Sequence, residues 1–116
     1  MRTETLTSVV AYSIKKGDVL GVARFAAVQA AKSSSSMLPL SSSTLIRSTS
    51  VEFTLGNDFI DIEVTVQGIG VSVEMPAFSA AATGALSIYD MCKSADRTMT
   101  IGPVELVEVS GHSGTH

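Results

Sequence analysis

Asp90 and Lys93 have the residue types and the spacing best suited to acid–base chemistry in this 116-residue chain. They stand three positions apart in a segment whose apolar residues recur at helical spacing, so both side chains lie on neighbouring parts of one helix face. A lysine that is partly removed from water can titrate near neutrality and transfer protons. By itself, however, the same spacing is more typical of a solvent-exposed ion pair, which contributes about 0.3 kcal/mol.

Three further charged residues stand in or near the first turns of predicted helices. Lys16 precedes Asp18, a good helix cap. A cation beside a helix N-terminus suits phosphate oxygens, although a solvated pair of Lys15 and Lys16 is the simpler interpretation. Glu74 precedes the last predicted helix, where the helix dipole alone explains a carboxylate. Arg24 can pair with a phosphate or with Glu74, and the sequence leaves both open.

Cys92 is the only cysteine of the chain. Its spacing places it on an apolar helix face, and no cationic pattern around it would stabilise a thiolate, which predicts a buried and inert thiol. A single cysteine excludes an internal disulfide and suggests neither a zinc site nor an oxidising compartment. The two histidines, His112 and His116, stand in Gly- and Ser-rich residues 111–116, which we expect to be a mobile tail.

The composition is that of one globular domain over residues 1–116, with 45% hydrophobic residues. Only 16% of the residues are charged, against roughly 25% in typical soluble proteins, and the mean hydropathy is +0.34. Such a chain is expected to bury part of its surface against other subunits. We therefore predict a homo-oligomer.

The charge and the apolar runs exclude two classes of partner. A net charge of −3 excludes a broad attraction to nucleic acid phosphates. The longest apolar runs are about five residues, against the ~20 that a membrane-spanning helix needs. The first residues also lack the basic and then apolar pattern of a secretion signal. We therefore expect a cytoplasmic protein without a membrane segment.

Hydrophobic periodicity predicts the elements that must position these residues. Helices are expected over 3–12, from Asp18 to about Lys32 and from Pro76 to about Ala95, and strands over 51–55, 60–67 and 101–109. Residues 55–58 have turn chemistry, which predicts an antiparallel hairpin, and Pro103 places the last strand at an edge. This order of elements predicts an α+β sandwich with the helices on one face of the sheet.

Serine dominates residues 33–44, with Met37-Leu38-Pro39-Leu40 in the middle of the run. Composition alone indicates a flexible linker. The apolar tetrapeptide favours an ordered loop, because long structureless loops in compact domains are usually functional or disordered. The sequence leaves the two interpretations open.

Three blocks of residues, taken together, resemble a known family. They are Lys16-Gly-Asp-Val-Leu20 with Arg24 and Ala30-Ala31-Lys32, then Val73-Glu74-Met75, and then Ile88-Tyr89-Asp90-Met91-Cys92-Lys93. With Leu38-Pro39-Leu40 between them, the chain resembles the molybdenum cofactor biosynthesis protein C (MoaC) family of cyclic pyranopterin monophosphate synthases over nearly its whole length.

The resemblance implies a ferredoxin-like fold, a hexamer-like assembly and a reaction. The family converts a cyclised dihydro-GTP intermediate into cyclic pyranopterin monophosphate with release of pyrophosphate, and the resemblance implies neither a metal nor another cofactor. By resemblance, Lys16, Asp90 and Lys93 are predicted to be catalytic. Contacts to the nucleotide-derived substrate are predicted for Arg24, Ser42, Glu74 and His112.

The chain departs from the family's pattern where the family keeps its site. Ser41-Ser42-Ser43 stands in place of Cys-His-Pro. Ser42 can hydrogen-bond a substrate but has no pKa near 7, and losing a general acid–base group typically costs ~100- to 10,000-fold. Pro76 replaces a second carboxylate, and His112 stands near a lost lysine. Residues 2–6 resemble the start of the family's first helix, so we expect the family's additional N-terminal strand to be absent from residues 1–116.

These departures leave three functions open. The first is a cyclic pyranopterin monophosphate synthase-like lyase with impaired or altered chemistry, which the retained charged residues favour. The second is a cyclase or lyase for another small anionic substrate, in which the Asp–Lys pair moves the protons. The third is a non-catalytic homologue that only binds nucleotide or assembles.

Overall fold

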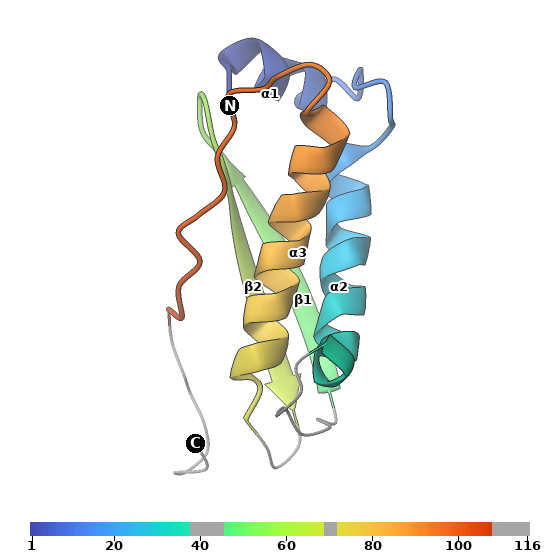
Figure 1. The fold of residues 1–116 in the computed structure, drawn as a ribbon, viewed down its shortest axis with the longest axis vertical. Helices are drawn as coiled ribbons and strands as arrows, with labels where there is room; N and C mark the ends of the chain where they lie inside the picture. Colours follow the sequence, from blue (N-terminus) through green and yellow to red (C-terminus); the bar gives the residue numbers. More distant parts are fainter. Residues whose placement is uncertain (38–45, 69–71, 108–116) are drawn as a thin grey trace.

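The computed structural model describes residues 1–37, 46–68 and 72–107. These residues form three helices, α1 (Thr3–Val10), α2 (Val19–Met37) and α3 (Glu74–Cys92), and two strands, β1 (Ile46–Leu55) and β2 (Ile60–Gly68). In Figure 1, α2 and α3 lie side by side over one face of the β1–β2 sheet, and α1 crosses the end of the molecule where α3 finishes. The predicted α+β class is confirmed, and the arrangement is compatible with a ferredoxin-like sandwich.

The two strands form the predicted antiparallel hairpin, in which Val51 lies opposite Val64 and Phe53 opposite Ile62. These residues share the face that packs under the helices, while the alternate positions are exposed. β1 begins at Ile46, five residues before the predicted start, because the polar residues that precede Val51 also pair along β2.

Asp18 caps α2 as predicted, since its Oδ1 accepts a hydrogen bond from the Gly21 N–H at 3.0 Å. The helix continues to Met37, so the prediction that residues 33–36 leave the helix is wrong. Serine costs a helix well under 1 kcal/mol per residue relative to alanine. Ala30, Ala31 and Ser34 are buried, so packing extends past the predicted end. Residues 38–45 lie outside the described part of the chain.

α1 ends at Val10, two residues before the predicted end, in a Schellman motif. The Tyr12 N–H donates to the Val9 carbonyl at 3.2 Å, and the Ser13 N–H donates to the Ser8 carbonyl at 2.9 Å. Tyr12 takes a φ of +57°, where glycine is usual, and its side chain is exposed. The chain therefore turns sharply here toward the start of α2.

Small residues let α2 and α3 approach closely, as the alanine-rich sequence predicts. Ala23, Ala27 and Ala80 are fully buried. A Cβ added to Gly84 would lie 3.6 Å from the Cβ of Ala27 and 3.7 Å from the carbonyl oxygen of Ala23. α3 contains Pro76 in its first turn as predicted, but it ends at Cys92 and residues 93–95 form a turn.

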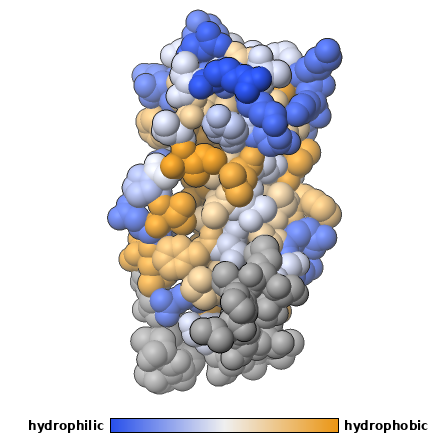
Figure 2. Space-filling model, in the orientation of Figure 1, coloured by the Kyte–Doolittle hydropathy of each residue, from blue (hydrophilic) through white to orange (hydrophobic). Residues whose placement is uncertain are grey.

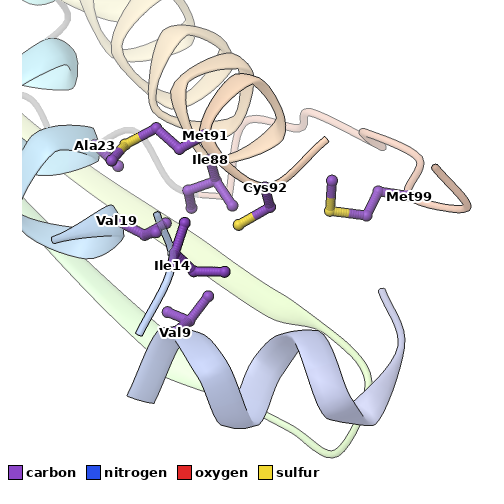
Figure 3. Close-up of a cluster of buried hydrophobic side chains, with 8 residues drawn as sticks. All are labelled: Val9, Ile14, Val19, Ala23, Ile88, Met91, Cys92 and Met99. Carbon is purple, nitrogen blue, oxygen red and sulfur yellow. The ribbon is translucent and has the colours of Figure 1, made fainter. Parts of the chain in front are cut away.

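A hydrophobic cluster fixes the end of the molecule that carries residues 90–93. It joins α1, the segment that follows α1, α2, α3 and the segment that follows α3. Figure 3 shows its side chains, which are Val9, Ile14, Val19, Ala23, Ile88, Met91, Cys92 and Met99. The Cys92 thiol is fully buried, and burial raises its pKa. The prediction of a buried thiol is confirmed.

The predicted last strand is wrong for residues 101–107, which are exposed and not in a strand. No backbone hydrogen bond joins them to another described residue. The apolar residues alternate as in a strand, but this segment has no described partner strand. In Figure 1 this orange-red segment runs down the side of the molecule beside β2. Residues 108 and 109, and the predicted tail over 111–116, lie outside the described residues.

Candidate functional site

Lys16, Asp90 and Lys93 meet at the C-terminal end of α3. The Lys93 Nζ lies 2.9 Å from the Asp90 Oδ1. The Lys16 Nζ lies 4.0 Å from the Asp90 Oδ2 and donates a hydrogen bond to the Asp90 backbone carbonyl at 3.2 Å. The fold thus brings the three residues that were predicted to be catalytic from two distant parts of the sequence into one cluster.

The segment before α2 places Lys16 in this cluster. The Gly17 N–H donates to the Ile14 carbonyl at 3.0 Å, and Ile14 is buried in the hydrophobic cluster of Figure 3. Gly17 has a φ of +117°, a conformation that residues with a side chain rarely adopt. A tight turn with a buried anchor therefore presents Lys16 to the last turn of α3.

The charges of the cluster favour an ionised carboxylate and an excess of positive charge. The hydrogen bond from Lys93, and then the charges of Lys16 and Lys93, hold the pKa of Asp90 below its ordinary value. The Asp90 side chain is 63% exposed and the two lysine side chains are about half exposed. Two ammonium groups beside one carboxylate leave a net charge of about +1 open to solvent, which suits a phosphate-bearing ligand.

Glu74 lies at the other end of α3, as the first residue of the helix. The Ser72 hydroxyl donates to its Oε1 at 3.4 Å, and the Glu74 N–H lies 3.5 Å from the same hydroxyl oxygen. Sixteen residues of helix at 1.5 Å per residue put Glu74 about 24 Å from Asp90. The fold of a single chain therefore does not bring Glu74 to the Lys16–Asp90–Lys93 cluster.

Arg24 points toward the sheet. Its Nε and Nη2 donate to the Val51 carbonyl at 3.3 and 3.2 Å, and its guanidinium lies 5.1 Å from the centre of the Phe53 ring. The described residues contain no ion pair between Arg24 and Glu74, so that alternative is wrong. The substrate contact that was predicted for Arg24 stays a prediction.

Two predicted substrate contacts, Ser42 and His112, lie outside the described residues. The ranges 1–37, 46–68 and 72–107 hold no group of three His, Cys, Asp or Glu side chains that could bind a metal ion. Within the same ranges, no helix is long and apolar enough to cross a membrane.

Asp96 is the residue near this cluster that the sequence analysis missed. It is 1% exposed, and hydrogen bonds from the backbone N–H of Arg2 and from Thr98 and Thr5 hold its pKa far below its usual range. The Asp96-Arg97-Thr98 segment allows an Asx turn, which is a signal that sequence alone could provide. The contact with Arg2 spans 94 residues and leaves no local pattern.

Comparison with known proteins identifies the family to which the sequence is similar. Residues 1–112 match the sequence profile of the MoaC family. A protein of Thermoanaerobacter sp. (strain X514) is 44% identical over 114 residues, which cover 96% of this chain and 72% of that protein. A protein of Roseiflexus castenholzii is 42% identical over 96% of this chain and 72% of its own length. A protein of Geobacter metallireducens is 43% identical over 99% of this chain and 74% of its own length. All three are named cyclic pyranopterin monophosphate synthase.

Proposed function

This chain belongs to the MoaC family, and we propose that it acts in molybdenum cofactor biosynthesis as a cyclic pyranopterin monophosphate synthase-like lyase. Its substrate is then a cyclised dihydro-GTP intermediate, from which pyrophosphate is released. The observation that carries the proposal is the convergence of Lys16, Asp90 and Lys93 at one end of α3. The family membership disfavours both a different substrate and a purely structural role.

The two lysines suit the phosphate groups of such a substrate. The ammonium groups of Lys16 and Lys93 flank one carboxylate and can donate hydrogen bonds to phosphate oxygens on the solvent side. Asp90 holds Lys93 in place, and it is ionised near neutral pH. The half-exposed Lys93 ammonium carries protons that it can donate to a bound substrate.

The serine in place of the family's histidine limits the rate. A hydroxyl does not titrate near pH 7, so the proton transfers fall to the Asp90–Lys93 pair. We propose that Ser42 serves only as a hydrogen-bond partner for the substrate. The expected activity is then lower than that of a relative with the histidine, by the ~100- to 10,000-fold that a general acid–base group contributes.

We further propose that the site is completed by a second copy of the chain. Glu74 is too far from Asp90 to share one small substrate within a chain, but a twofold axis across α3 would place the Glu74 of one copy near the cluster of the other. Large apolar side chains of α2 and α3 are exposed, namely Val22, Phe25, Met75 and Leu86. Figure 2 shows apolar residues across the middle of the molecule, below a polar end. Such surface favours a homo-oligomer.

The direct test is to mix the purified protein with the cyclised dihydro-GTP intermediate and to follow pyrophosphate release. The Asp90→Ala variant is the control, because Asp90 is exposed and its loss leaves the hydrophobic cluster intact. Release above this control is expected. Equal release from both proteins, or none from either, would contradict the proposed function.

A further inference from the structure

Asp96 is the one buried carboxylate among the described residues, and the proposed reaction does not use it. Its Oδ2 accepts hydrogen bonds from the Arg2 N–H at 2.7 Å and the Thr5 hydroxyl at 3.0 Å. Its Oδ1 accepts from the Thr98 N–H at 2.8 Å and the Thr98 hydroxyl at 2.6 Å, and lies 3.8 Å from the Arg2 Nε. The carboxylate thus joins the start of α1 to the segment that follows α3.

This carboxylate stands three residues after Lys93, in the same turn. α3 ends at Cys92, and beyond it the Ala95 and Asp96 N–H groups donate to the Cys92 carbonyl at 2.9 and 3.0 Å. Lys93 lies inside the turn that these two bonds close. Ser94 and Ala95 are exposed, so their side chains add little packing to hold the turn.

The Asp96 carboxylate supplies this missing support through contacts on both sides. On one side is the first turn of α1, whose N-cap residue Arg2 makes no capping hydrogen bond with its own side chain. On the other side is Thr98, which precedes the buried Met99. Both neighbours are anchored in the core, so they form a rigid frame around the turn.

We propose that Asp96 is a positioning residue for Lys93. By fixing the turn 93–96 against α1 and Thr98, it keeps the Lys93 ammonium beside Asp90 and ready for the substrate. This role rests on the proposed function, in which Lys93 contacts the substrate. The contact between Lys93 and Asp90 that Asp96 is proposed to maintain is, however, present in the free protein. Asp96 itself is enclosed by the chain and does not touch the substrate.

The test is the Asp96→Asn variant, with the pKa of the Asp90 carboxyl measured by NMR titration in the absence of substrate. An asparagine amide presents one NH₂ group where the carboxylate presented an oxygen, so either the Arg2 or the Thr98 backbone N–H loses its acceptor. The hydrogen bond from Lys93 is the main cause of the lowered Asp90 pKa. We expect the Asp90 pKa in Asp96→Asn to rise toward the value in Lys93→Gln, where that bond is lost.

Two matched variants separate positioning from general stability. Val66→Ala weakens a separate hydrophobic cluster that contains no residue of α1 or of the turn, so it is expected to leave the Asp90 pKa at the wild-type value. Thr98→Val keeps the shape of the side chain and removes one hydrogen bond to Asp96, so it is expected to shift the Asp90 pKa in the same direction by less. It also provides a readout if Asp96→Asn does not fold.

The results are unambiguous in either direction. An unchanged Asp90 pKa in folded Asp96→Asn, or in Thr98→Val if the first variant does not fold, would overturn the positioning role. An equal shift in Val66→Ala would overturn it as well. The titration needs no substrate, so it is independent of the pyrophosphate assay. An absence of pyrophosphate release from the wild type would contradict the proposed function, while the titration would still decide whether Asp96 positions Lys93.

Discussion

The two ends of α3 hold their charged residues in different ways. At the C-terminal end, Asp90 is in contact with Lys93 and with Lys16 from a distant segment, and the following turn is fixed by a buried carboxylate. At the N-terminal end, the described contacts of the Glu74 carboxylate are limited to its neighbour Ser72. One end of the helix therefore carries a preformed cluster of three charged side chains, and the other end carries a single carboxylate with one polar neighbour.

The two ends of α3 also differ in how much packing surrounds their charged residues. The C-terminal end borders the hydrophobic cluster of Figure 3, which joins five segments of the chain. At the N-terminal end, Glu74 is only partly buried. A preformed cluster is suited to chemistry, whereas a single carboxylate with one neighbour is suited to completing a site on another copy.

The largest expected effect comes from mixing variants of the two ends. Lys93→Ala is expected to lose about 100-fold in pyrophosphate release as a proton-transfer group, and Glu74→Ala about tenfold or more as a charged contact. If a site uses both ends from two copies, refolding the two variants together restores up to roughly a quarter of wild-type activity, because half of the random dimers carry one intact site.

The control for this mixture is a Lys93→Ala protein refolded with Lys93→Ala/Glu74→Ala, in which no intact site can form. Recovery above this control supports the shared site. Activity that equals the sum of the separate variants would show that the two ends of α3 do not meet across copies.

The next effect concerns the support beneath the C-terminal end. Asp96→Asn is expected to lower the free energy of unfolding by about 1–3 kcal/mol at pH 7, since a partly buried backbone N–H loses its charged acceptor. Ser72→Ala at the exposed N-terminal end is the matched control and is expected to change it by less than about 0.5 kcal/mol. Urea unfolding of both variants measures the difference, and equal losses would remove the contrast between the two ends.

The pH dependence of this effect follows from the sign of the pKa shift. The folded Asp96 pKa is depressed, so its contribution to stability is fully present above the unfolded value of about 3.9. It is lost as the pH falls from there toward the folded pKa. The stability gap between wild type and Asp96→Asn should therefore be constant from about pH 5 to 7 and should narrow below about pH 4. A gap that widens in acid would contradict the assignment.

The smallest effect is a gain. Tyr12 is 71% exposed and holds a φ of +57° at the end of α1. Tyr12→Gly is expected to stabilise the fold by about 1 kcal/mol, because glycine adopts this conformation without a steric cost. Tyr12→Ala, which keeps the strain and loses the ring, is the control. A melting temperature for Tyr12→Gly at or below that of Tyr12→Ala would show that the positive φ has no steric cost for glycine to relieve.

Sequence patterns predicted the elements with a strong period and a clear end signal. The alternation in residues 60–67, the Asp18 cap and Pro76 in a first turn all agree with the structure. The patterns failed where the side chains have no strong preference for helix, strand or loop, because packing then decides the structure. The serine run continues α2, and Ser34 is buried with the face of that helix. Apolar residues over 101–107 form no strand because no described strand pairs with them.

The site could be predicted only where its residues are close together in the sequence. Asp90 and Lys93 are linked by helical spacing, which sequence shows directly. Their contact with Lys16 spans 74 residues, and only the resemblance to a family suggested it. Asp96 was missed because its partners, Arg2 and Thr5, are distant in sequence, and the contact depends on how α1 packs against α3.

The most direct test of the proposed site compares two adjacent lysines. Lys16 contacts Asp90, whereas Lys15 is exposed and forms no ion pair with any described residue. Lys16→Ala is expected to reduce pyrophosphate release from the cyclised dihydro-GTP intermediate by about tenfold to a hundredfold, as expected for a lost hydrogen bond to a charged group. Lys15→Ala should release pyrophosphate at the wild-type rate. Equal rates for the two variants would contradict a site built on Lys16, Asp90 and Lys93.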